Sequence, residues 1–76
     1  MTNTALLEQV IEESGYKKSY IAKCIGISSY ALALKINNKN EFKANEIEII
    51  CQLLGINTKD RMRIFFANGV DFKSTK

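Results

Sequence analysis

Lysine side chains are concentrated in one part of the 76-residue chain, between residues 17 and 43. That segment has six lysines and one glutamate, a net charge of +5, whereas residues 1–16 sum to −3 and residues 44–76 to +1. A basic surface attracts a polyanion. Serine, tyrosine and asparagine side chains in the same segment can hydrogen-bond to phosphates or to nucleic-acid bases. The chemistry that these residues predict is binding of a polyanion.

The residue types that catalysis requires are absent or isolated. The chain has no histidine, no nucleophile beside a base, no close pair of carboxylates and no glycine-rich loop that could hold a phosphate. We therefore expect neither an enzyme nor a cofactor. Cys24 and Cys51 are too few and too far apart to bind a metal. The count alone would permit a disulfide, but we expect two reduced, buried thiols in a cytosolic protein.

Hydrophobic periodicity predicts five short helices joined by short turns. The chain has no proline and only four glycines, and its apolar residues recur three or four positions apart. Gly15, Gly26 and Gly55 are placed to end helices, whereas Ser28 and Asn57 are placed to cap the next ones. The expected helices cover residues 5–14, 18–25, 29–36, 44–54 and 58–67.

Residues 18–36 have the pattern of two helices that cross steeply over a short turn. Ala22 is small, as a close helix crossing requires, and Gly26 can adopt a turn conformation that a side chain would resist. Ser28 then caps the second helix. A plain helical hairpin can show the same pattern, but the coincidence favours a helix-turn-helix. The apolar wedge between the two helices would consist of Ile21, Ile25, Ile27 and Leu32.

With these residues in place, the chain resembles the Cro and repressor family of phage and bacterial regulators (XRE-like), especially those of Gram-positive phages. The resemblance implies a compact, all-α, five-helix fold like that of lambda repressor, with the helix-turn-helix in the second and third helices. The chain departs from the family at Lys35, where an apolar residue is common, and we expect Ile36 to replace it in the core. The resemblance rests on these blocks: Ser14-Gly15-Tyr16-Lys17, Ile21-Ala22, Ile25-Gly26-Ile27-Ser28, Lys35-Ile36-Asn37, Glu41-Phe42 and the ending Ile64-Phe65-Phe66 to Val70-Asp71.

The resemblance also implies a sequence-specific transcriptional regulator, most simply a Cro-like repressor, which binds double-stranded DNA with helix 29–36 in the major groove. Leu34 fits the core equally well. The residues expected to contact bases are Ser28, Ser29, Tyr30, Ala33 and Leu34. The residues expected to contact phosphates flank this helix and are Lys17, Lys18, Asn37, Asn38, Lys39, Asn40 and Lys43.

We expect residues 1–76 to form a single domain, with residues 70–76 as a short tail. Because one such domain covers only a short half-site, a homodimer on a pseudo-palindromic operator is expected. No small-molecule ligand is expected. Phe65 can equally close the core. The candidate dimer interface is the aromatic surface of Phe65, Phe66, Val70 and Phe72.

The start of the chain has neither a basic segment nor an apolar signal core, and no apolar run is long enough to span a membrane. We therefore expect the protein in the cytoplasm of a bacterial host cell, associated with the nucleoid. Two alternatives remain open: an antitoxin-like regulator that holds a partner protein with its C-terminal helix, and a protein-interaction module without DNA binding.

Overall fold

The chain folds into five α-helices in a computed structural model that describes residues 1–66. The predicted all-α fold is therefore confirmed, and these residues include no strand. The second, third and fourth helices have the predicted bounds. The first begins one residue earlier than predicted, and the last ends at Phe65 instead of Ala67. The helices are α1 (Thr4–Ser14), α2 (Lys18–Ile25), α3 (Ser29–Ile36), α4 (Ala44–Leu54) and α5 (Thr58–Phe65).

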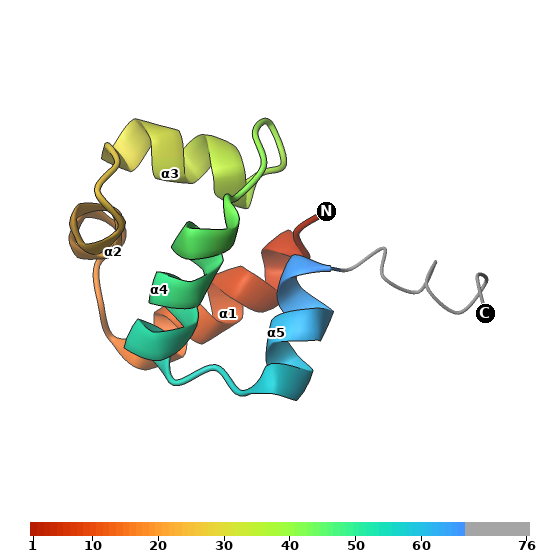
Figure 1. Cartoon of the computed structure of the whole chain (residues 1–76). Helices are drawn as coiled ribbons and strands as arrows, with labels where there is room; N and C mark the ends of the chain where they lie inside the picture. Colours follow the sequence, from red (N-terminus) through yellow and green to blue (C-terminus); the bar gives the residue numbers. More distant parts are fainter. Residues whose placement is uncertain (67–76) are drawn as a thin grey trace.

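Helices α1, α4 and α5 form the body of the molecule, and α3 lies along one edge of it (Figure 1). In this view α2 is seen end-on and α3 from the side, so the two helices cross steeply. Helix α2 contacts both α3 and α4, and α1 contacts α3, α4 and α5. The arrangement gives α3 one side against the body and another side facing away from it.

The turn between α2 and α3 has the predicted local geometry. Gly26 adopts a left-handed conformation with φ of 91°, and its N–H donates to the carbonyl oxygen of Ala22 at 2.9 Å. Ala22 is only 1% exposed, as the close crossing requires. The hydroxyl of Ser28 accepts from the N–H of Ala31 at 3.0 Å and caps α3. These contacts define the direction in which α3 leaves α2.

Every helix contributes to one apolar core. Each fully buried leucine or isoleucine side chain stabilises the fold by about 1.5–3 kcal/mol relative to an exposed one. Phe42 returns to the core after the loop, and its ring packs edge-on against that of Phe65, with the ring centroids 5.3 Å apart. The largest fully buried side chains are Leu7, Ile21, Leu32, Ile36, Ile50 and Ile64.

The prediction that both cysteines are buried is wrong for Cys24. Both thiols are free, but Cys51 is buried in the core whereas Cys24 is exposed on α2. The inward side of α2 is already filled by Ile21 and Ile25, which lie one turn apart. Cys24 instead lies one turn after the exposed Tyr20, on the outer side of the helix.

A buried ion pair joins α3 to α4. The Lys35 ammonium lies 2.7 Å from Oε1 of Glu46, and the two side chains are only 10% and 6% exposed. The same oxygen accepts a hydrogen bond of 2.8 Å from the N–H of Lys43, at the start of α4. Ile36 is fully buried, as predicted, so both residues at the end of α3 face inward. A charged side chain is accommodated at this depth because its partner is equally buried.

The ionised form of Glu46 is favoured by its neighbours. Burial acts most strongly and raises the pKa of this carboxyl, but the hydrogen bonds and charges of Lys35 and Lys43 together outweigh it, so the pKa is lowered. A carboxylate with a lowered pKa stabilises the folded state at neutral pH. That contribution is complete above the unfolded pKa and is lost as the pH falls through the folded pKa.

Glu46→Gln should destabilise the protein at neutral pH by about 3 kcal/mol, because it leaves the Lys35 charge buried without a counter-ion. As the pH falls from about 6 to about 3, the variant should lose less free energy of unfolding than the wild type does. Urea denaturation across this range measures both effects. The matched control is Glu48→Gln, which removes an exposed carboxylate from the same helix. Parallel pH profiles for wild type and Glu46→Gln would show that the pair contributes nothing.

Candidate nucleic-acid interface

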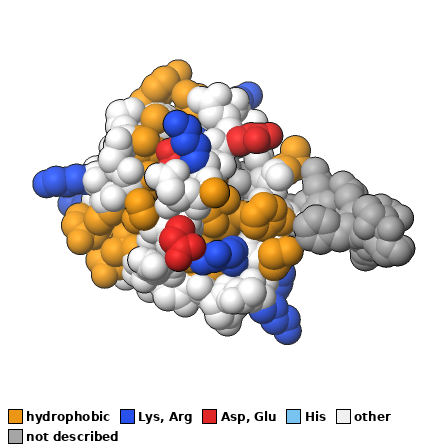
Figure 2. Space-filling view, viewed as in Figure 1, with side chains coloured by type: hydrophobic (Ala, Val, Ile, Leu, Met, Phe, Trp, Pro, Cys, Tyr) orange, Lys and Arg blue, Asp and Glu red, His pale blue; other side chains and the backbone are white. Residues whose placement is uncertain are grey.

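The outer side of α3 is exposed along its length. Ser29, Tyr30 and Ala33 are exposed, and Tyr30 is the most open of the large apolar side chains in residues 1–66, at 73%. Figure 2 shows hydrophobic side chains along the upper edge of the molecule, over α3. Three of the five residues predicted to contact bases therefore share one open surface.

The other two predicted base-contact residues also shape the ends of α3. Ser28 is exposed, and because its oxygen accepts from Ala31, its hydroxyl proton remains available for donation. Leu34 is half-buried, so its exposure lies between that of a base-contact residue and that of a core residue. Its carbonyl oxygen accepts from the N–H of Lys39 at 2.8 Å and of Asn40 at 3.3 Å. Leu34 therefore fixes the loop that follows the helix.

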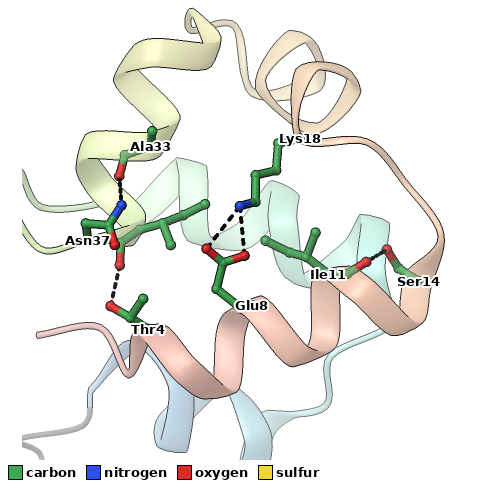
Figure 3. Close-up of polar contacts among 8 residues, drawn as sticks. Thr4, Glu8, Ile11, Ser14, Lys18, Ala33 and Asn37 are labelled. Carbon is green, nitrogen blue, oxygen red and sulfur yellow. Dashed lines mark hydrogen bonds and ion pairs between the residues drawn. The ribbon is translucent and has the colours of Figure 1, made fainter.

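Two lysines mark the start of α2, on one side of α3. Lys17 is the exposed N-cap residue of α2. Lys18 lies 2.9 Å from the carboxylate of Glu8 on α1, and Figure 3 shows this ion pair bridging the two helices. Lys18 is still 47% exposed, so its ammonium group can reach a second anion. Lys23, in the last turn of α2, is also exposed and adds to the positive charge of this helix.

The loop after α3 forms the second basic group. Asn37, Lys39, Asn40 and Lys43 are exposed, and in Figure 2 Lys or Arg side chains stand out both over α2 and over this loop. The side-chain amide of Asn37 donates to the carbonyl of Ala33 at 2.9 Å, which closes the end of the helix (Figure 3). Positive charge therefore flanks α3 on two sides.

Asn38 is exposed as well, but it differs from the rest of that loop in its hydrogen bonds. Its side chain forms two hydrogen bonds of 2.8 Å with the backbone of Thr2, accepting from the N–H and donating to the carbonyl. The hydroxyl of Thr4 donates to the carbonyl of Ile36 at 2.6 Å, next to these bonds. Thr2 and Thr4 are 36 and 32 residues away from their partners. No local sequence pattern could have indicated these contacts.

A second feature absent from the predictions is a pair of stacked tyrosines beside the start of α2. The rings of Tyr16 and Tyr20 lie 5.2 Å apart and both are partly exposed. A hydrogen bond with Cys24 raises the pKa of Tyr20 above the usual value of a phenol. This aromatic surface adjoins Lys17, but helical periodicity alone could not show that the two rings stack.

The structure divides the candidate dimer interface. Phe65 is 4% exposed and packs on Phe42, so its ring belongs to the core of the monomer. Phe66 is 40% exposed, and Met62, one turn earlier, is 39% exposed. Val70 and Phe72 lie outside the described residues. We call the exposed pair, Met62 and Phe66, the α5 apolar surface.

The described part of the chain offers little for other kinds of site. Within residues 1–66, no three histidine, cysteine, aspartate or glutamate side chains cluster closely enough to hold a metal ion. None of the helices in this part has both the length and the apolar character that crossing a bilayer requires.

None of the curated proteins and none of the solved structures compared with the chain matches it. One family model matches residues 3–68, and its description is "protein of unknown function (DUF739)". The match contains all five helices, and so the exposed side of α3 and both groups of lysines. On this match, the chain belongs to the DUF739 family.

Proposed function

We propose that this protein is a sequence-specific regulator of transcription that binds double-stranded DNA through α3. The observation that carries the proposal is the position of this helix. Its inner residues, Leu32 and Ile36, are buried in the core, whereas its outer side is exposed and flanked by lysines. A recognition helix that reads base edges projects from a rigid body, and basic residues beside it bind the phosphate backbone.

The dimensions of α3 suit the major groove. An α-helix with its side chains is about 10–12 Å in diameter, and the major groove of B-DNA is about 12 Å wide. Ser29 and Tyr30 lie in the first turn, the part of a recognition helix that approaches the bases. Their hydroxyl groups can hydrogen-bond to base edges, and the Ala33 methyl group can contact a thymine methyl.

The flanking groups suit two stretches of phosphate backbone. The start of α2 has positive backbone N–H groups as well as Lys17 and Lys18, and both features attract a phosphate. Lys39, Asn40 and Lys43 lie in the loop on the other side of α3. Contacts at both places would hold the helix in register without reading sequence.

A homodimer on a pseudo-palindromic operator would complete the site, because one domain covers only a half-site. The α5 apolar surface supports pairing with a second copy. The same surface supports a second candidate, in which α5 holds a different partner protein as antitoxin-like regulators do. A Cro-like repressor of this kind would act at the nucleoid of a bacterial host cell and be controlled mainly by its own concentration.

Lys39→Ala should weaken binding to specific and random duplex DNA alike. Loss of one phosphate contact should lower the slope of log affinity against log salt concentration by about 0.9. Fluorescence anisotropy titrations at several salt concentrations measure this slope. The matched control is Lys59→Ala, which removes an exposed lysine from α5, and its slope should equal that of wild type. Equal slopes for both variants and wild type would contradict a phosphate contact at Lys39.

Tyr30→Ala should instead reduce discrimination between duplex sequences. The loss at the affected base positions should be about 1–3 kcal/mol, because a base-edge contact disappears while the phosphate contacts remain. Selection of bound sites from a random duplex pool, followed by competition titrations, measures it. Equal losses on selected and random DNA would refute base reading by Tyr30, and no affinity of wild type for any duplex at low salt would overturn the proposed function.

Phe66→Ser should weaken self-association, because it removes half of the α5 apolar surface. Sedimentation velocity at micromolar concentration should show two wild-type chains of 8.6 kDa bound to each operator duplex, and fewer duplexes with two chains for the variant. If wild type binds each operator duplex only as a single 8.6 kDa chain, the homodimer is contradicted and the partner-protein role is favoured.

A further inference from the structure

The first residues of the chain form a link between the loop after α3 and the end of α5. Thr2 is buried, and its backbone N–H and carbonyl both bond to the side-chain amide of Asn38. The N–H of the next residue, Asn3, donates to the carbonyl oxygen of Ile64 in the last turn of α5 at 2.6 Å. Two elements that are far apart in sequence are therefore joined through one short backbone segment.

The backbone of Asn38 also has a special conformation. Its φ is 64°, and it is the one residue other than glycine with positive φ among residues 1–66. Asparagine tolerates this left-handed conformation better than most side chains do. The conformation reverses the chain directly after α3, so that the N–H of Lys39 reaches back to the carbonyl of Leu34 at 2.8 Å. The position of Lys39 is therefore set at Asn38.

The hydrogen-bonding groups of Asn38 are already occupied. Its oxygen accepts from Thr2, and its amide nitrogen donates to the Thr2 carbonyl and lies 3.4 Å from the hydroxyl of Thr4. That hydroxyl in turn donates to the carbonyl of Ile36. An amide group has two protons and one oxygen, so a phosphate could bind Asn38 only by displacing these partners.

We propose that Asn38 is a positioning residue for DNA binding and does not itself contact a phosphate. Its amide fastens the loop after α3 to the N-terminal segment and thereby to α5, so that Lys39 is already held where the phosphate backbone passes. An anchored loop loses less conformational freedom when it binds, which strengthens the contact that Lys39 makes. This inference rests on the proposed function and replaces the sequence-based assignment of Asn38 as a phosphate contact.

The discriminating variant is Asn38→Gly, because glycine tolerates the positive φ while the side chain with its amide is lost. Without DNA, amide hydrogen exchange at Thr2 should become faster in this variant. With DNA, the salt slope should fall by about 0.9, as when the Lys39 contact is lost. A double-mutant cycle then separates the two roles. Lys39→Ala should change affinity far less in the Asn38→Gly background than in wild type, whereas independent phosphate contacts would give additive losses.

Thr4→Val provides a second test from a residue of α1. The replacement has a similar shape but removes the hydroxyl that bonds to Ile36, so it should weaken DNA binding in the same direction as Asn38→Gly. The matched control, Thr58→Val, changes the first residue of α5 in the same way and should leave binding unchanged. If Asn38→Gly does not fold, as judged by circular dichroism, the comparison of the two threonine variants decides the question.

The outcomes separate this inference from the proposed function. If wild type binds no duplex, the proposed function fails and this inference fails with it. If wild type binds DNA but Asn38→Gly keeps its salt slope, or its losses add to those of Lys39→Ala, the positioning role is overturned and the proposed function stands. If Thr2 exchange is unchanged in Asn38→Gly, the link itself is refuted.

Discussion

The left-handed turn at Gly26 is the constraint on which the rest of the candidate interface depends. Because its φ is 91°, the chain can leave α2 at once and cross back over Ala22 instead of continuing as one longer helix. That crossing buries Leu32 and Ile36 and leaves Tyr30 exposed. A side chain at the turn would strain this conformation, and any tilt of α3 would move its outer residues relative to both groups of lysines.

A second constraint acts at the other end of α3. One oxygen of Glu46 accepts both from the ammonium of Lys35 and from the N–H of Lys43. The end of α3 and the start of α4 are therefore fixed at the same atom, and the loop between them has both ends held. With the link from Asn38 to Thr2, this loop is restrained at three places although most of its residues are exposed. Rigid loops of this kind suit contacts that depend on position.

The helices were predictable from the sequence because their signals are local. Apolar spacing and the glycines gave correct bounds for α2, α3 and α4, and the turn residues Ala22, Gly26 and Ser28 have the predicted geometry. The buried pair of Lys35 and Glu46 was not predictable, because periodicity cannot show that a lysine faces inward to meet a carboxylate. Tertiary partners likewise decided the exposure of Cys24 and the orientation of Asn38, whose bonding partner lies 36 residues away.

The distribution of aromatic residues confines the intrinsic tyrosine fluorescence to one part of the molecule. The chain has three tyrosines and no tryptophan, and all three tyrosines, Tyr16, Tyr20 and Tyr30, lie partly open to solvent at α2 and α3. The buried aromatic rings are phenylalanines, which absorb and emit only weakly. Intrinsic ultraviolet emission therefore reports on the α2–α3 surface and not on the core. A molecule that binds to this surface would therefore change that emission without changing the core.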